Sequence, residues 1–298
     1  MLSNAENLMR GCTLCPRRCN VDRTSGMVGV CGMSDTLYIS RAAPHMWEEP
    51  PISGTSGSGT IFFTGCNLRC VFCQNRIISH EKKGDPVTEE ELTEIIFKLA
   101  DEGVLNINFV TPTHYTDTLA RVLTRIKPRL FIPVVWNSGG YESPDTLRML
   151  DGLVDIYLPD FKYVDAALSE AYSAAPDYVD RATEAILEMH RQVDTVVLDE
   201  NGLMRRGLVI RHLILPGHRA DSVAVLRHLV NVLPPKSFRI SLMRQYTPDF
   251  ALDYPCKNLH RRLTDFEYRS VLAEAEHLGI DGYMQGKDAA DRVFTPEF

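Results

Sequence analysis

Residues 61–75 have the sequence IFFTGCNLRCVFCQN, and this stretch governs how the rest of the chain is interpreted. The apolar residues 61–63 are typical of a short buried strand, and Gly65 supplies the turn after it. Cys66, Cys70 and Cys73 follow with the spacing C-x3-C-x2-C. Three thiolates on one loop can hold three irons of a [4Fe–4S] cluster, which leaves the fourth iron open to another ligand. Spacing alone also allows a three-thiolate zinc site completed by a distant histidine.

The residues around these cysteines resemble the signature of the radical S-adenosylmethionine (SAM) superfamily, and in detail that of the glycyl-radical-enzyme activases. The resemblance implies that the open iron chelates the amino and carboxylate groups of SAM. It also implies that Phe72, the aromatic residue before the third cysteine, lies by the adenine of SAM, and that Asn75 contacts SAM. The three cysteines are therefore expected to be both metal ligands and catalytic residues.

A second cysteine group lies nearer the N-terminus. Cys12, Cys15, Cys19 and Cys31 have the spacing C-x2-C-x3-C-x11-C. Four thiolates form a complete ligand set for zinc and equally for an iron–sulfur cluster, so a second metal centre of either kind is expected. Residues 11–32 resemble the N-terminal module of PflX-type proteins, which are homologues of pyruvate formate-lyase activating enzyme.

Strand and helix patterns alternate along the rest of the chain. The expected strands are 61–64, 106–110, 130–135, 154–158, 208–215 and 238–243. The expected helices are 88–103, 117–127, 143–150, 166–192, 221–232 with Asp221 as its cap, and 264–278. A small hairpin is expected at 195–202, with its turn at Asn201-Gly202.

This alternation predicts an α/β fold with a parallel sheet and right-handed crossovers. Six strand–helix units are too few for a closed eight-stranded barrel, but the pattern itself allows a doubly wound sheet or an open partial barrel. The radical SAM resemblance selects the partial (β/α)6 TIM-like barrel. We expect a cysteine-rich N-terminal module and connector over 1–59, and a barrel with a C-terminal helix over 60–298.

The residues that follow the barrel strands are the candidates for SAM binding, because sites in βα barrels lie at the carboxyl ends of the strands. Asp160 and Lys162 follow the fourth strand and match the Asp-x-Lys motif of the activases. Alternation of side chains places both on one face. By resemblance, Lys162 pairs with the SAM carboxylate, Arg211 on the fifth strand does the same, and Asp160 orients Lys162 or accepts a hydrogen bond from SAM.

Three further residues complete the predicted cofactor site. Asn137 or Ser138, after the third strand, is expected to touch the ribose or the methionine part of SAM, and Gln245 replaces a histidine of the activases. Two departures from the activase pattern are visible. Residues 111–115 lack the acidic residue that contacts the SAM amino group, and Trp136 stands where the activases carry an aspartate.

Composition narrows the possible partners. The 298 residues include 32 basic and 39 acidic side chains, a net charge of −7, which argues against nucleic-acid or anionic-membrane binding. No apolar run reaches the length of a membrane span, and no secretory pattern opens the chain. We therefore expect a cytoplasmic protein, in which a reducing environment favours metal-bound cysteines over disulfides.

The sequence thus predicts a radical SAM oxidoreductase. A reduced [4Fe–4S] cluster would cleave SAM to methionine and a 5′-deoxyadenosyl radical, which takes a hydrogen atom from the substrate. Flavodoxin or ferredoxin is the expected electron donor, and a protein, a peptide or a small molecule is the substrate. Two alternatives stay open: a true activase that acts on a glycyl-radical enzyme, and a non-enzymatic iron–sulfur or zinc protein for electron transfer.

Overall fold

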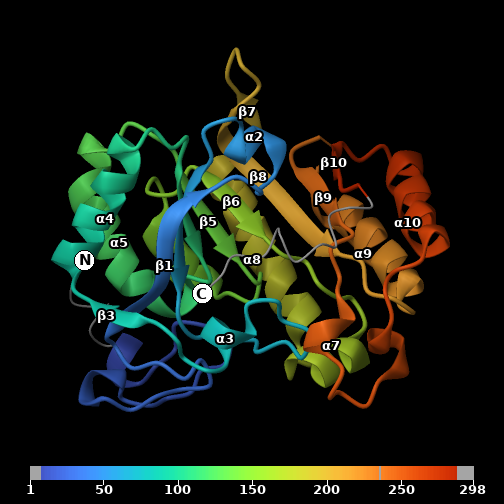
Figure 1. Ribbon diagram of the computed structural model, residues 1–298, viewed down its shortest axis with the longest axis horizontal. Coiled ribbons are helices and arrows are strands. Elements are labelled where there is room, and N and C mark those ends of the chain that lie inside the picture. Colours follow the sequence, from blue (N-terminus) through green and yellow to red (C-terminus); the bar gives the residue numbers. More distant parts are fainter. Residues whose placement is uncertain (1–7, 235, 287–298) are drawn as a thin grey trace.

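The fold centres on one large sheet whose middle strands run parallel (Figure 1). The computed structural model describes residues 8–234 and 236–286. The sheet has ten strands, in the order β10-β9-β8-β6-β5-β4-β2-β1-β3, with β7 paired to β8. The strands are β1 Leu37–His45, β2 Ser58–Phe63, β3 Asp85–Val87, β4 Ile107–Val110, β5 Val134–Ser138, β6 Ile156–Pro159, β7 Val197–Leu198, β8 Met204–Leu213, β9 Arg239–Met243 and β10 Gly282–Met284. Within the described residues the sheet does not close, which is the predicted partial barrel.

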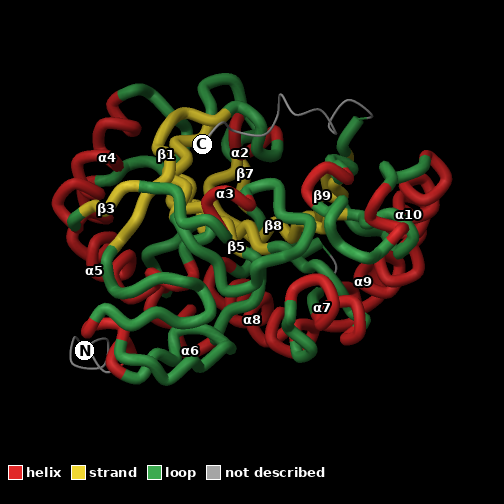
Figure 2. Tube along the Cα trace, turned by 60° about the horizontal axis from the view of Figure 1, so that its bottom comes forward, coloured by secondary structure: helices red, strands yellow, loops and turns green. Residues whose placement is uncertain are grey.

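Helices follow most of the parallel strands and gather around one side of the sheet (Figure 2). They are α2 Pro50–Ser53, α3 Arg76–Ser79, α4 Glu89–Asp101, α5 Thr116–Ile126, α6 Pro144–Leu147, α7 Ala166–Ser173, α8 Tyr178–Val193, α9 Arg219–Val232 and α10 Asp265–His277. The capping boxes expected before α4 and α10 are both present, at Thr88–Glu91 and Thr264–Glu267. These boxes satisfy backbone N–H groups that each helix end leaves free.

The main core lies between the sheet and these helices, and a smaller apolar layer lines the inner face. Val135 packs inward with Ile52 of α2, whereas its neighbour Trp136 belongs to the main core. Side chains along a strand therefore alternate between the main core and the barrel interior. On β5 this rule places Asn137 on the inner face and Ser138 on the same side as Trp136.

Four details that bear on the site differ from the sequence-based expectations. The third barrel strand, expected at 130–135, is β5 at Val134–Ser138, so Asn137 and Ser138 lie on the strand and not after it. The helix expected over 166–192 is two helices, because Ala174 has a left-handed φ of 49° and Pro176 has no N–H to continue the ladder. Asp221 lies in the first turn of α9 instead of capping it, and its carboxylate accepts from the N–H groups of Val164 and Asp165. The short strand β10 after α10 was not expected.

The connector between the cysteine module and the barrel is part of the sheet. β1 pairs antiparallel with β2, with Ala42 opposite Ile61. After β1, residues 46–57 turn to the amino ends of the barrel strands, where Asn106 Nδ2 donates to the Ile52 carbonyl oxygen at 2.8 Å. The chain therefore covers the amino end of the barrel before it enters β2.

Candidate functional site

A cavity of about 650 Å³ lies on the inner face of the sheet. Its lining comes from three parts of the chain: the cysteine loop, the carboxyl ends of the barrel strands, and the connector before β2. Seven of the eight predicted cofactor-binding residues line it: Phe72, Asn75, Asn137, Asp160, Lys162, Arg211 and Gln245. Cys70 and Cys73 also line it. The structure thus brings seven predicted cofactor residues and two of the three loop cysteines to one cavity.

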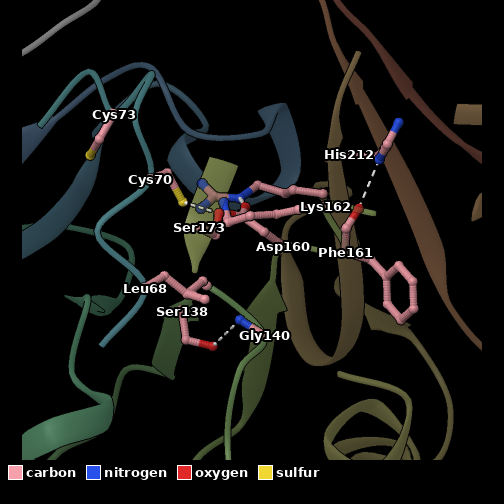
Figure 3. Close-up of polar contacts among 12 residues, drawn as sticks. Leu68, Cys70, Cys73, Ser138, Gly140, Asp160, Phe161, Lys162, Ser173 and His212 are labelled. Carbon is pink, nitrogen blue, oxygen red and sulfur yellow. Dashed lines mark hydrogen bonds and ion pairs between the residues drawn. The ribbon is translucent and has the colours of Figure 1, made fainter. Parts of the chain in front are cut away.

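The three thiols of the cysteine loop have different neighbours in the structure. Cys70 Sγ lies 3.0 Å from Ser173 Oγ, and Figure 3 shows it on the side of Asp160 and Lys162. Cys73 Sγ accepts a hydrogen bond from Ser79 Oγ at 3.4 Å, while Cys66 lies half-buried at the start of the loop. Among the described residues, no group of three or more Cys, His, Asp or Glu side chains is gathered closely enough to hold a metal ion.

The chemistry of this donor set nevertheless fits an iron–sulfur cluster. Burial raises the pKa of the Cys73 thiol to about 12. Burial also raises the pKa of Cys70, against the opposing charge of Lys162. Such thiols are protonated at neutral pH, so binding of a metal would release their protons. Three thiols on one loop, with a cation beside them and a cavity next to them, are suited to a cluster with an adjacent ligand.

A buried charge trio forms the polar centre of the cavity. Asp160 Oδ2 lies 2.5 Å from Lys162 Nζ, and Asp160 Oδ1 lies 3.0 Å from Arg211 Nε. Burial opposes the charge on Asp160, but Lys162 and Arg211 outweigh it and lower the pKa of that carboxyl. Arg211 Nη2 also donates to Asn137 Oδ1 at 2.5 Å. Asp160, Lys162 and Arg211 are therefore charged and held in fixed positions.

Phe72 and Gln245 border the same space. The Phe72 ring packs edge-on against Tyr172 and Tyr246, with ring centroids 6.3 Å apart in each pair. The carbonyl oxygen of Gln245 accepts from Gln74 Nε2 at 2.9 Å, and its side-chain oxygen accepts from Gln285 Nε2 at 3.0 Å. The cysteine loop is thereby tied to the end of β9.

Ser138 is a predicted cofactor residue that does not line the cavity. Its hydroxyl donates to Glu142 Oε2 at 2.6 Å, and the same carboxylate accepts from Trp136 Nε1 and Thr113 Oγ1. The buried Glu142 thus collects three donors on the outer side of β5. Alternation along the strand explains the outcome, since Asn137 takes the inward position.

His114 is likewise turned away from the cavity. Its ring is buried, and Nε2 lies 2.8 Å from the carbonyl oxygen of Thr64, just before the cysteine loop. Since a carbonyl only accepts, Nε2 carries the proton in the neutral ring. Burial, together with the charge of Arg23, lowers the pKa of His114 to about 3. His114 is therefore a neutral support for the loop.

The N-terminal cysteine module docks directly on the same loop. The Cys66 N–H donates to the Cys31 carbonyl oxygen at 3.4 Å. Arg23, completely buried, donates to the His114 carbonyl oxygen at 2.7 Å and lies 3.9 Å from Cys12 Sγ. All eight cysteines are free thiols, and the four of this module are not gathered into a metal site in the described structure.

Among the cavity residues that sequence analysis missed are two carboxylates, Glu48 and Glu49. Both come from the connector, 11 or more residues before the first barrel strand expected from sequence. The one local signal is a pair of acidic residues directly before Pro50-Pro51, which is also common on a solvent-exposed turn. Their burial depends on contacts with Asn108 and Ser241, which lie 60 and 192 residues further along the chain and which no local pattern reveals.

The chain belongs to the radical SAM superfamily, whose family model matches residues 60–231. It is 31% identical over 287 residues to the uncharacterized protein MJ0674 of Methanocaldococcus jannaschii, an alignment that covers 93% of this chain and 78% of that protein.

Solved structures with the same fold include Streptococcus suis SuiB bound to its precursor peptide SuiA, with a TM-score of 0.51 and 13% identity over 74% of this chain. The match covers 46% of SuiB, so this chain corresponds to about half of that protein. Methylornithine synthase PylB matches with a TM-score of 0.49 and 14% identity, over 76% of this chain and 70% of PylB. No helix in the described part of the chain is long and apolar enough to span a membrane.

Proposed function

We propose that this protein is a radical SAM oxidoreductase in which Cys66, Cys70 and Cys73 hold a [4Fe–4S] cluster. The observation that carries the proposal is that Cys70 and Cys73 line the same cavity as the Asp160–Lys162 pair. The bound cluster would supply one electron to the sulfonium of SAM, so that a 5′-deoxyadenosyl radical takes a hydrogen atom from the substrate. The protein itself contributes positioning and exclusion of water.

The charge trio is suited to bind the carboxylate of SAM. Lys162 and Arg211 both reach Asp160, so a second carboxylate beside them would share two cations that are already fixed. Because these cations are already held in place, binding of the ligand costs little additional conformational entropy. Asn137 and Asn75 add hydrogen-bonding groups at the cavity wall, and Phe72 offers a ring for the adenine.

The N-terminal cysteines are proposed to hold a second centre, zinc or iron–sulfur. Cys12, Cys15, Cys19 and Cys31 include a complete four-thiolate set, and the Cys31 backbone touches Cys66. An iron–sulfur centre in this position would lie on a direct route for an electron from flavodoxin or ferredoxin to the catalytic loop. A zinc centre would instead stabilise the position of the catalytic cysteine loop.

The central test is release of 5′-deoxyadenosine. Anaerobically reconstituted protein with dithionite and SAM is expected to produce it, and the Cys66/Cys70/Cys73→Ala triple variant is expected to produce none. Cys256→Ala provides a matched control, because Cys256 Sγ contacts Tyr172 OH and does not line the cavity. Undiminished 5′-deoxyadenosine from the triple variant would refute the assignment.

A further inference from the structure

The cavity has a floor at the amino end of the barrel. The floor segment, residues 45–54, contains α2 and leads into β2, whereas the cysteine loop follows β2 at its other end. Figure 1 shows α2 and α3, the helix after the cysteine loop, at opposite ends of the strands. Glu48 and Glu49 of the floor segment line the cavity. They therefore face the interior from the end opposite the proposed cluster.

Glu48 is fully engaged with the barrel strands. Its Oε1 accepts from Asn108 Nδ2 at 2.9 Å and from Asn137 Nδ2 at 3.4 Å. Its Oε2 lies 3.5 Å from Arg211 Nη1. Three partners from three strands hold the floor segment in place. Glu48 is therefore a structural anchor.

Glu49 is different, because part of its carboxylate is unpaired. The side chain is 8% exposed and lines the cavity, and Ser241 forms a hydrogen bond with it. Its Oε2 is buried and has no hydrogen-bond partner among the described residues. Burial raises the pKa of Glu49, against the charge of Arg211. A buried carboxylate oxygen without a partner is costly, and a cation beside it removes that cost.

Among the residues that the structure describes, the cavity lining offers no spare cation for Glu49. The lining contains three carboxylates, Glu48, Glu49 and Asp160, against the two cations Lys162 and Arg211. Both cations bind Asp160, and Arg211 also faces Glu48. A cationic ligand in the cavity would supply the positive charge that the ionised Glu49 lacks. The same lining includes Met46, Trp47 and Met243, which suit an alkyl chain.

We propose that Glu49 binds a primary ammonium group of the substrate, carried on a short alkyl chain. The substrate class is then an alkylamine, such as a lysine side chain of a peptide or a free diamine. This inference rests on the proposed function, because it assigns the substrate of the same cavity. SAM held by the cysteine loop, Lys162 and Arg211 would lie on the cysteine-loop side of the cavity, so that the substrate lies between SAM and Glu49.

The test is equilibrium binding of a simple probe to the reconstituted full chain with saturating SAM. The probe is n-butylammonium, compared with n-butanol of similar size and no charge. Wild-type protein is expected to bind n-butylammonium at least tenfold more tightly than n-butanol. Glu49→Gln is expected to lose that preference at least tenfold. Glu188→Gln is the matched control, since Glu188 is 7% exposed and lies on α8 away from the cavity.

Two results would overturn the proposal. One is equal binding of n-butylammonium and n-butanol by wild-type protein, a comparison that does not depend on folding of any variant. The other is a tenfold loss of SAM affinity in Glu49→Gln, which would assign the carboxylate to SAM itself. Failure of the proposed function is distinguishable, because absence of 5′-deoxyadenosine from wild-type protein leaves the n-butylammonium comparison intact.

Discussion

The two cysteine groups of this protein have similar ligand chemistry but different surroundings. Cys70 and Cys73 line a cavity, and Cys70 lies near Lys162. In the N-terminal module, Cys12 lies against the buried Arg23, and no cysteine of the module lines that cavity. The difference teaches that the number of thiols does not separate the two groups, whereas access to a ligand-sized cavity does.

The largest expected effect separates the two groups directly. Cys70→Ala is expected to abolish 5′-deoxyadenosine release with dithionite, because it removes a ligand of the proposed catalytic cluster. Cys15→Ala is expected to retain release with dithionite, since a chemical reductant bypasses the N-terminal module. Product is measured by chromatography after anaerobic reconstitution, with folding checked by circular dichroism. Equal loss in both variants would end the functional distinction between the groups.

The next effect tests the cavity side of the comparison. Lys162→Met and Arg211→Met each remove a cation proposed to bind the SAM carboxylate. Loss of one partner of a buried charge pair costs about 2–5 kcal/mol, or roughly 30-fold to a few thousand-fold in the SAM dissociation constant. Lys127→Met is the control, because Lys127 pairs with Asp155 outside the cavity. SAM binding within threefold of wild type in both variants would show that the carboxylate lies elsewhere.

His114 tests the junction of the two regions, because its carbonyl oxygen meets Arg23 and its ring supports Thr64. In the folded protein burial lowers its pKa to about 3, against about 6.5 when unfolded. Between these values only the unfolded chain gains the proton, so the free energy of unfolding falls as the pH drops below about 6.5.

The size of this effect follows from the proton linkage. Between pH 7 and pH 5 the contribution of His114 is about 2 kcal/mol. His114→Gln keeps a donor for the Thr64 carbonyl but does not titrate. Its free energy of unfolding is therefore expected to fall by about 2 kcal/mol less than that of wild type over this pH range. Urea unfolding of both proteins at the two pH values measures the difference. Equal losses of unfolding free energy in the two proteins would mean that the pKa of His114 is not lowered in the folded state.

The smallest expected effect concerns the metal content of the N-terminal module, which is expected to stay unchanged. In the Cys66/Cys70/Cys73→Ala triple variant, the N-terminal module is expected to keep its own centre, because its four thiols are separate from the mutated loop. Metal analysis then gives about one zinc for a zinc centre, or about four irons with sulfide for a cluster. Absence of both metals, with all four thiols freely alkylated in native protein, would remove the second centre.

Much of the architecture was predictable because it depends on short-range patterns. The two capping boxes and the six parallel barrel strands follow from residue spacing. The break between α7 and α8 was also encoded locally, at Pro176, but the helical periodicity on both sides obscured it. Ser138 was assigned by resemblance, whereas alternation from Asn137 correctly directs it outward.

The predicted cofactor residues could be identified from the sequence, whereas the floor of the cavity could not. The cysteine spacing and the Asp160–Lys162 pair are readable in the chain, because residues within a few positions share one loop or one strand face. The partnership of Glu48 with Asn108 and Arg211 joins residues up to 163 positions apart. Only folding of the connector across the amino end of the barrel decides that these carboxylates are buried. A turn with the same sequence in solvent would leave them hydrated and without a role.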